Sequence, residues 1–399
     1  MSDELREAVS GRKVIVCCGA GGVGKTTTSA ALALGAAKLG RRVLVLTIDP
    51  ARRLAQAMGI PENSVRPVTI SPEQLRAVGV EQGALDAWML NPRVVFDGLV
   101  RKLAPTPAQA ERILKLRLYQ ALSDLVAGMQ EYTAAEALFG FSTSGAYDLI
   151  VLDTPPSRNA LEFLEAPGKL SRFLDEKIVS LFLPSEGTRR FSLLRKATEL
   201  IGNVFVKVFG EAFFAELQEF IGAFSGMFAA MRGHSEQVRS LLNSDDALFL
   251  LVTSPEQGAL AEARYFRTKL ASMSLPFGGF ILNRSWARTT GLKDPAAHRP
   301  TGANADLASA WAKLEHLADQ ERKLADRDTA LLAALQQDLA EKKASYPFGD
   351  RLEQPKKASY PLEEPSKKSY YPFAVAGPYY GDGVVDLPGL ARLAEALLA

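Results

Sequence analysis

The sequence predicts an α/β protein with a mostly parallel sheet flanked by helices, plus an inserted α-helical subdomain. Short apolar runs of strand length alternate with longer stretches of helical pattern, as parallel strands and their crossover helices require. A glycine-rich loop separates the first apolar run from the first helix. Two helical stretches, about 93–140 and 160–243, are too long for simple crossovers. We expect them to fold together as a helical subdomain beside the sheet.

The glycine-rich loop is a complete phosphate-binding motif in its expected setting. It follows the apolar run 14–18, precedes a helix over 27–39, and reads G-A-G-G-V-G-K-T from Gly19 to Thr26. Glycines let consecutive backbone N–H groups turn toward one point, and the helix start adds its positive dipole end. In such a P-loop NTPase the lysine reaches the β- and γ-phosphates and the threonine hydroxyl binds Mg²⁺. The predicted nucleotide-binding residues here are Gly21, Gly22, Val23, Gly24, Lys25, Thr26 and Thr27.

The other apolar runs supply the rest of the sheet. Buried strands are predicted at 43–48, 149–152, 248–252 and 280–282. Shorter or edge strands are candidates at 65–70 and 85–90, and a strand returning to the sheet is predicted at 373–376. Polar residues follow the carboxyl ends of these runs, where an open α/β sheet places its ligand site.

Two aspartates end predicted strands and complete the nucleotide chemistry. Asp153 follows four apolar residues and fits the role of holding Mg²⁺ through a water. Asp49 ends the second strand, so its carboxylate would orient the attacking water. The alternative for Asp49 is a cap for the helix 51–58, and one residue can serve both roles. With Lys25, Asp49 is the predicted catalytic residue. The histidines lie away from these strand ends, at His234, His298 and His316.

Composition excludes several classes of partner. The chain has 399 residues, 47% of them hydrophobic, and a net charge of +2, so we expect neither nucleic-acid binding nor stable membrane insertion. No signal-peptide pattern or run of transmembrane length is present, and we expect a cytoplasmic protein.

The two cysteines, Cys17 and Cys18, are adjacent in the first strand and point to opposite faces. They are expected to be small buried residues rather than a disulfide or a metal site.

Three segments together resemble the arsenical-pump and guided-entry (tail-anchored protein targeting) ATPase family. They are the loop 19–27, the segment 47–51 and the segment 153–158, with weaker support from Gly128-Met129-Gln130-Glu131 and from Leu282-Asn283-Arg284. The resemblance covers most of 12–290. It implies ATP hydrolysis with Mg²⁺ and a homodimer, or a heterodimer with a paralogue. It also implies that 153–158 forms switch II, that Asp49 lies in switch I, and that Asn283 and Arg284 contribute to the nucleotide site, with Asn283 at the adenine.

The sequence departs from the family pattern at two places. The family loop usually has lysine at the position of Ala20, where it reaches the partner's phosphates, so slow turnover is one expectation. Two other expectations are that another cation, such as Arg158, takes the place of this lysine, or that the chain pairs with a paralogue that retains it. The family's metalloid-binding and zinc-binding cysteines are also missing, because no cysteine follows Cys18.

The second helical stretch is rich in phenylalanine. Between 201 and 231 lie Phe205, Phe209, Phe213, Phe214, Phe220, Phe224 and Phe228, several of them in i, i+4 rows. The glycines Gly202, Gly210, Gly222 and Gly226 indicate kinks or close approaches. Two interpretations stay open: a groove for a hydrophobic client helix, and packing within the subdomain or against a partner subunit.

The C-terminal region contains an approximate repeat of Lys-Lys-Ala-Ser-Tyr-Pro, beginning at 342, 356 and 367. Its composition predicts a flexible loop or linker, with partner contact as the alternative. The last helix, 390–398, is expected to pack on the sheet, with membrane attachment as the alternative.

The predicted organisation follows from these features. The predicted nucleotide-binding core comprises 1–92, 146–160, 246–290 and 373–399. Helical insertions are predicted at 93–145 and 161–245, a helical segment at 291–340, and the low-complexity loop at 341–372. The predicted function is an Mg-dependent ATPase whose nucleotide state controls a dimer and a hydrophobic helical subdomain that binds a client or partner protein. The alternatives are a nucleotide-gated scaffold with little turnover and a positioning ATPase of the ParA/MinD kind.

Overall fold

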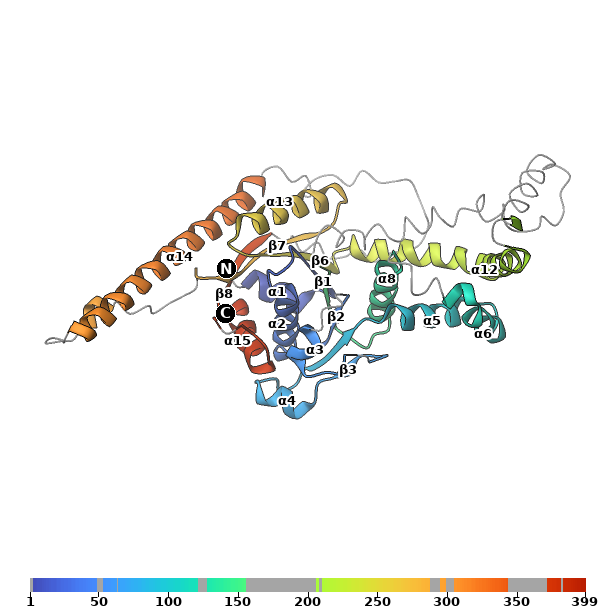
Figure 1. Ribbon diagram of the computed structural model, residues 1–399, viewed down its shortest axis with the longest axis horizontal. Coiled ribbons are helices and arrows are strands. Elements are labelled where there is room, and N and C mark those ends of the chain that lie inside the picture. Colours follow the sequence, from blue (N-terminus) through green and yellow to red (C-terminus); the bar gives the residue numbers. More distant parts are fainter. Residues whose placement is uncertain are drawn as a thin grey trace.

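A computed structural model describes residues 3–48, 53–62, 64–120, 128–155, 206–207, 210–287, 295–298, 305–343, 372–381 and 383–399. Its centre is one sheet of eight strands in the order β3-β4-β2-β5-β1-β6-β7-β8 (Figure 1). Neighbouring strands are parallel, except that β3 runs antiparallel to β4. The predicted α/β fold with a mostly parallel sheet is therefore confirmed.

The strands coincide with the apolar runs of the sequence. They are β1 (Val14–Cys18), β2 (Arg42–Thr47), β3 (Val68–Thr69), β4 (Ala84–Met89), β5 (Leu149–Asp153), β6 (Ala247–Thr253), β7 (Phe277–Ser285) and β8 (Phe373–Pro378). The run 85–90 is not at an edge, because the short β3 pairs with its outer side and supplies that edge. Burial on both faces explains why the central strands are continuously apolar.

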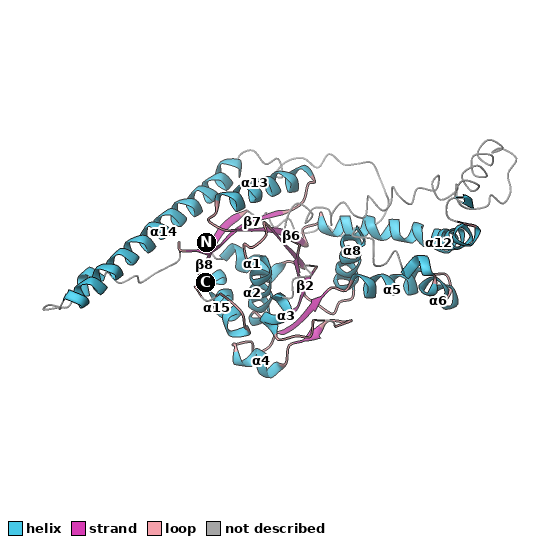
Figure 2. Cartoon of the chain, viewed as in Figure 1, coloured by secondary structure: helices cyan, strands magenta, loops and turns pink. Residues whose placement is uncertain are grey.

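Helices cover both faces of the sheet (Figure 2). They are α1 (Asp3–Gly11), α2 (Lys25–Lys38), α3 (Arg53–Met58), α4 (Pro72–Ala77), α5 (Pro92–Leu103), α6 (Pro107–Lys115), α8 (Gly128–Thr143), α12 (Glu211–Leu242), α13 (Gln257–Ser272), α14 (Ala305–Lys343) and α15 (Leu387–Leu398), with the 3₁₀ helix η2 (Pro295–His298). In the part of the chain that these ranges describe, no helix is long and apolar enough to cross a bilayer.

The alternation of side chains along β1 divides the core into two layers. Ile15 and Cys17 join the buried residues of α1, α2 and α15 on one face, whereas Val16 and Cys18 join those of α8, α13 and α14 on the other. The predicted opposite orientation of the two cysteines is thus confirmed. Burial raises the pKa of the Cys18 thiol to about 12 and that of Cys17 further. Both thiols therefore stay protonated at neutral pH.

The C-terminal helix α15 packs against α2 and completes the first layer. Leu390, Leu393 and Leu397 are buried on this side. The contact is close, since a Cβ at Gly35 of α2 would lie 2.4 Å from a methyl group of Leu398. The sequence predicts that this helix packs on the sheet, and it contacts β8 as well as α2, with its apolar stripe buried in the core.

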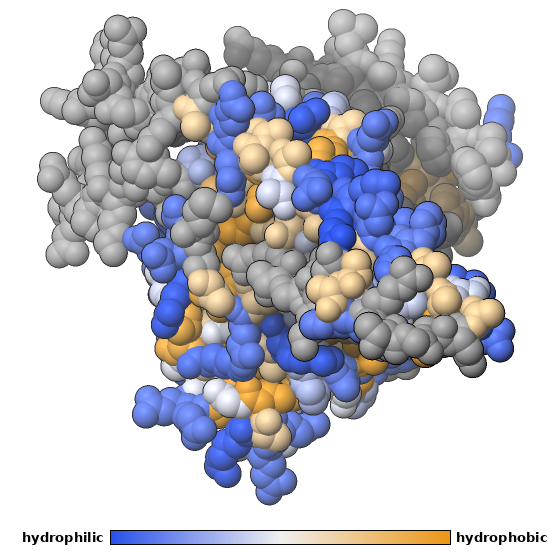
Figure 3. Space-filling view, turned by 90° about the vertical axis from the view of Figure 1, so that its left-hand side faces the viewer, coloured by the Kyte–Doolittle hydropathy of each residue, from blue (hydrophilic) through white to orange (hydrophobic). Residues whose placement is uncertain are grey.

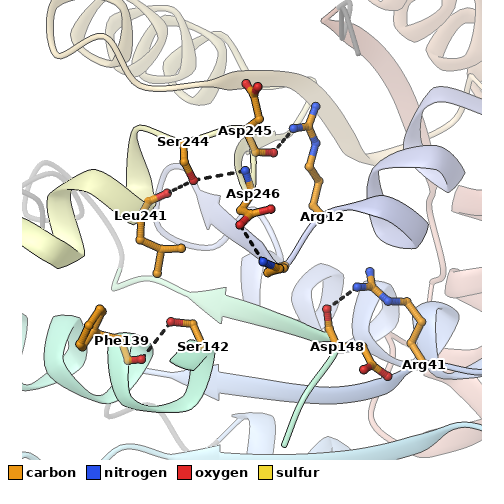
Figure 4. A network of polar contacts seen from close by, with 10 residues as sticks. Arg12, Arg41, Phe139, Ser142, Asp148, Leu241, Ser244, Asp245 and Asp246 are labelled. Atoms are coloured by element: carbon orange, nitrogen blue, oxygen red, sulfur yellow. Dashed lines mark hydrogen bonds and ion pairs between the residues drawn. The ribbon is translucent and has the colours of Figure 1, made fainter. Parts of the chain in front are cut away.

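Polar contacts fasten the amino ends of the strands (Figure 4). The Lys13 ammonium lies 2.9 Å from a carboxylate oxygen of Asp246, which links the start of β1 to the start of β6. The Arg41 guanidinium donates to the carbonyl of Asp148, which links β2 to β5. An exposed ion pair such as that between Lys13 and Asp246 contributes on the order of 0–1 kcal/mol. These contacts lie at the amino ends of the strands, whereas the glycine-rich loop follows the carboxyl end of β1.

Four helices, α5, α6, α8 and α12, lie together beside the sheet (Figure 1). Residues of α5 and α6 form a small apolar core together with Tyr119, and Phe220 of α12 packs against it; its members are Phe96, Leu99, Val100, Ala110, Ile113 and Tyr119. Gly210 precedes α12 with φ +88°, and α12 then runs through Gly222 and Gly226 as a single helix. The inserted helical subdomain is therefore present.

Helix α14 extends beyond the sheet. Its C-terminal half packs on β7 and β8 through Leu335 and Leu339, and its N-terminal half projects beyond the body (Figure 1). On the projecting half, Leu307, Leu314 and Leu317 are exposed. Figure 3, viewed from that side, shows hydrophilic and hydrophobic residues side by side on the surface.

Candidate nucleotide-binding site

The loop after β1 has the backbone that the motif predicts. Gly24 has φ +85°, which is the left-handed region that favours glycine, and it directly precedes α2. A Cβ at Gly24 would lie 2.3 Å from the side-chain nitrogen of Asn283, and one at Gly19 would lie 2.0 Å from the carbonyl oxygen of Val252. Both positions thus require glycine. The loop ends at the N-terminus of a 14-residue helix, whose dipole favours a bound anion.

Lys25 points into the loop that precedes it. Its ammonium donates to the carbonyl oxygen of Ala20 at 2.7 Å, and the side chain is buried, with 6% of the residue exposed. A buried lysine is costly unless its charge is compensated. The contact therefore keeps the cation at the centre of the loop, where phosphate oxygens can take the place of the carbonyl. The predicted position of Lys25 in the phosphate site agrees with this geometry.

Asp153 is the buried anion of the site. It is fully buried, and its Oδ2 accepts from the hydroxyl of Thr26 at 2.7 Å and from that of Thr47 at 2.9 Å. Ser29 lies 3.5 Å from the other carboxylate oxygen. The sheet register brings these groups together, because Thr47 of β2 and Cys17 of β1 are both paired with Asp153 of β5. A hydroxyl and a carboxylate oxygen in contact are the donor set that Mg²⁺ prefers.

Asn283 and Arg284 reach the loop from the end of β7. The Asn283 side-chain amide donates to the carbonyl of Val23 at 2.8 Å, and the Arg284 guanidinium donates to that of Gly22 at 3.3 Å. Arg284 has φ +55°, a conformation that is uncommon outside glycine and that tends to mark functional sites. Both residues predicted for the nucleotide site therefore lie against the phosphate loop.

Some predicted residues cannot be placed. Asp49, Arg158 and the switch II residues after Pro155 lie outside the described part of the chain. Thr27 is half-buried in the first turn of α2, and Gly21 and Gly22 are exposed. Sequence reasoning missed Thr47, whose hydroxyl contacts Asp153. The sequence carried no signal for this contact, because it depends on the pairing of β2 with β5.

The site suits a nucleoside triphosphate with Mg²⁺. Lys25 and the helix N-terminus supply positive charge, and Thr26 and Asp153 supply oxygen ligands. Within the residues that the structure describes, no group of three or more His, Cys, Asp or Glu side chains is arranged to hold a metal ion. This is compatible with Mg²⁺, which binds through one or two protein groups together with substrate phosphates.

Comparison with known proteins gives a consistent result. Residues 12–291 match the family model described as "Anion-transporting ATPase". "ATPase ASNA1 homolog 1" of Paramecium tetraurelia is 25% identical over 276 residues, and "ATPase get3" of Schizosaccharomyces japonicus is 26% identical over 279 residues. Each alignment covers 68% of this chain and 74% of the relative. The "Arsenical pump-driving ATPase" of Acidiphilium multivorum is 31% identical over 160 residues, which are 39% of this chain and 26% of that protein. The alignment of this chain with a further relative, from Aquifex aeolicus, covers 58% of that relative's length.

Proposed function

Because the chain belongs to the anion-transporting ATPase family, we propose that it binds Mg-ATP at the phosphate loop and hydrolyses it. One observation carries the proposal. Thr26, at the start of α2, donates to the fully buried Asp153 at 2.7 Å, beside a lysine that already points into the loop. This arrangement supports the proposal, because phosphoryl transfer needs a metal ligand, a carboxylate and a phosphate-binding cation close together.

The residues would divide the work as follows. Lys25 would exchange the Ala20 carbonyl for β- and γ-phosphate oxygens, and the loop N–H groups would bind the same phosphates. Thr26 and Asp153 would hold Mg²⁺, which neutralises charge on the phosphates when bound. Asn283, already in contact with the loop, would bind the adenine, with Arg284 beside it. Asp49 would position the attacking water from switch I.

The experiment that tests this proposal is a turnover assay at saturating Mg-ATP. Lys25→Ala should abolish ATP binding, because the loop loses its cation. Asp49→Asn should retain binding and lose hydrolysis, because the amide keeps the size of the side chain but not its charge. The matched control is Lys38→Ala at the other end of α2, where the lysine pairs with Glu395 at 2.6 Å. Equal turnover in wild type and Lys25→Ala would refute the proposal.

The family resemblance adds a dimer and a client to the proposal. We expect Mg-ATP to favour a dimer and to change the helical subdomain, because segments next to a γ-phosphate switch can move with it. A hydrophobic helix of a client protein would bind to the apolar side chains of α12. Phe213 supports this, since 38% of its surface is exposed, whereas Phe220 packs in the subdomain core.

These two phenylalanines provide a matched test of client binding. Phe213→Ser should weaken capture of a lysine-flanked apolar peptide of about 20 residues without lowering Tm. Phe220→Ser should lower Tm, because it removes a packed ring from the core. If Phe213→Ser leaves peptide capture unchanged, α12 is not the client site. Phe205, Phe209 and the side chains of Phe224 and Phe228 lie outside the described part of the chain.

A nucleotide-gated scaffold with little turnover is the second candidate, and Ala20 favours it. This residue is buried and offers the loop only its carbonyl oxygen. It provides no cation for a partner's phosphates. Sedimentation with and without Mg-ATP, combined with the turnover assay, separates the two candidates. A scaffold would change its assembly state with a negligible rate of hydrolysis.

A further inference from the structure

The end of β7 departs from a regular strand at the two residues that contact the phosphate loop. Leu282 pairs with Ala376 of β8 and Ser285 pairs with Pro378, so three steps along β7 match two along β8. Such a bulge redirects the side chains next to it, and bulges are frequent beside functional sites. Arg284 lies within this bulge and has φ +55°. The direction of the side chains here therefore depends on what holds the irregular backbone in place.

Asp328 of α14 holds the backbone directly after the bulge. Its Oδ2 accepts from the backbone N–H of Trp286 at 2.9 Å and from the hydroxyl of Ser285 at 3.4 Å. The oxygen of the same hydroxyl accepts from the N–H of Ala287 at 3.1 Å. Three consecutive residues after Arg284 are therefore tied to one carboxylate, which lies 42 positions beyond Trp286 in the sequence.

The Asp328 carboxylate is buried in spite of its charge. Asp328 and Ser285 both have no exposed surface. A buried carboxylate is costly unless charges and hydrogen-bond donors compensate it. Arg327 supplies a charge, because its Nε and Nη2 lie 2.9 and 2.8 Å from Oδ1. Oδ1 thus faces the arginine, and Oδ2 serves the end of β7.

The helix that carries Asp328 is fixed to the sheet beside the bulge. Leu335 and Leu339, about two and three turns farther along α14, are buried in the core. Gln336 donates to the carbonyl of Ala374 in β8 at 3.0 Å. Asp328 therefore lies on a packed element, as a residue that orients others requires.

We propose that Asp328 is a positioning residue of the nucleotide site and acts through Asn283 and Arg284. By fixing 285–287 it keeps Arg284 in the left-handed conformation, which is unfavourable for a residue other than glycine and persists only where its surroundings impose it. The Asn283 amide is then held 2.8 Å from the carbonyl of Val23, in place for the base of ATP. This role rests on the proposed binding of ATP, and it adds a residue of α14 to those that set nucleotide affinity.

The test compares the affinity for Mg-AMP-PNP, measured by calorimetry, in Asp328→Leu and Asp328→Asn. Leucine keeps the branched shape and removes both acceptor oxygens, so the nucleotide should bind about three- to tenfold more weakly, as the loss of one hydrogen bond predicts. Asparagine retains an oxygen for the Trp286 N–H and should restore most of the affinity. The matched control is Asp338→Leu on the same helix, whose carboxylate lies 3.9 Å from Arg264 of α13. It should bind the nucleotide as wild type does.

A double-mutant cycle with Asn283→Ala separates positioning from a general loss of stability. If Asp328 acts through Asn283, Asp328→Leu should weaken binding by less than about twofold in the Asn283→Ala background, whereas independent effects multiply. Ser285→Ala removes the second link to Asp328 and leaves the Trp286 N–H paired, so it takes the place of Asp328→Leu in the cycle if that variant does not fold. The proposal is overturned if the affinity is unchanged in these variants or if the two effects multiply.

Hydrogen exchange of the nucleotide-free protein separates this role from the proposed function. In Asp328→Leu the peptides that contain 283–287 and the phosphate loop 19–24 should exchange faster than in wild type, because Asn283 and Arg284 no longer rest on the loop. In Asp338→Leu they should exchange as in wild type. Failure of the wild type to bind Mg-AMP-PNP would refute the proposed ATPase function. Unchanged exchange of the loop in Asp328→Leu would by itself overturn the positioning role.

Discussion

Replacing Thr47 by valine tests whether the buried carboxylate of the site depends on a neighbouring strand. The substitution removes a hydroxyl that donates to Asp153 Oδ2 at 2.9 Å and leaves a side chain of nearly the same shape. Thr47 has only 1% of its surface exposed and Asp153 has none, so water has little access to the vacated position. Asp153 would keep its contact with Thr26 and lose one of its donors.

The expected effects are large enough to measure. A hydrogen bond to a buried charged group contributes about 1.5–3 kcal/mol. For a chain of 399 residues each kcal/mol corresponds to a change in Tm of only about 1 °C. Loss of a group that orients a metal-binding carboxylate typically costs 10–100-fold in metal affinity. We therefore expect Thr47→Val to lower Tm by about 2–4 °C and to shift the Mg²⁺ dependence of ATP turnover upward by at least about tenfold.

Thermal denaturation and turnover across a Mg²⁺ titration measure these two effects. Thr47→Ser is the matched control, because it keeps the hydroxyl and removes only a methyl group. It should retain most of the wild-type Mg²⁺ dependence. If Thr47→Val and Thr47→Ser have the same Mg²⁺ dependence as wild type, Thr47 does not support Asp153. If both lose it equally, the loss cannot be assigned to the hydrogen bond of the Thr47 hydroxyl.

Three further predictions concern the loop and the first strand. Gly24→Ala should weaken Mg-ATP binding by about tenfold or more, since a left-handed non-glycine residue costs about 1–2 kcal/mol and its Cβ would lie 2.3 Å from Asn283 Nδ2; unchanged affinity in a fluorescent-nucleotide titration would contradict this. Ala20→Lys should raise turnover or tighten the ATP-bound dimer, and a fast wild-type rate indifferent to the change would show that another cation already serves. Burial raises the pKa of Cys17 and Cys18 above the ordinary value of 9.0, so their contribution to stability is complete below pH 9.0 and is lost as the pH rises toward 12. Denaturant titrations should therefore show a steeper alkaline loss of stability in wild type than in a Cys17→Ala, Cys18→Ala variant, and equal slopes would contradict the assignment.

The features that the sequence predicts well are those encoded in consecutive residues. The loop 19–26 needs only local spacing, and β1 lies at its predicted residues, Val14–Cys18. Both depend on short-range physics, namely glycine conformations and an apolar run buried on two faces. The contact of Asn283 with Val23, 260 positions earlier in the chain, agrees with a role that only the family resemblance supplied.

The features that the sequence could not supply depend on register and strand order. The run 85–90 resembles an edge strand in isolation, yet β4 lies between β2 and β3. Whether a strand is at an edge is decided by its neighbours, and these are distant in sequence. Thr47 is a similar case, because its role follows from the pairing of β2 with β5 at Asp153.

The nucleotide site is held in place before any ligand arrives, and this determines what binding must change. Asp153 is already oriented by Thr26 and Thr47, so an Mg²⁺ ion held there would meet a carboxylate with a fixed direction. Lys25 and Arg284 are different, since each donates to a carbonyl of the loop itself, at Ala20 and Gly22. A triphosphate must replace these contacts with its own oxygens, and charge-assisted bonds to phosphate are the stronger ones. Binding of ATP therefore releases two loop carbonyls while the carboxylate stays still. Motion in this protein should accordingly begin at the loop and at Arg284.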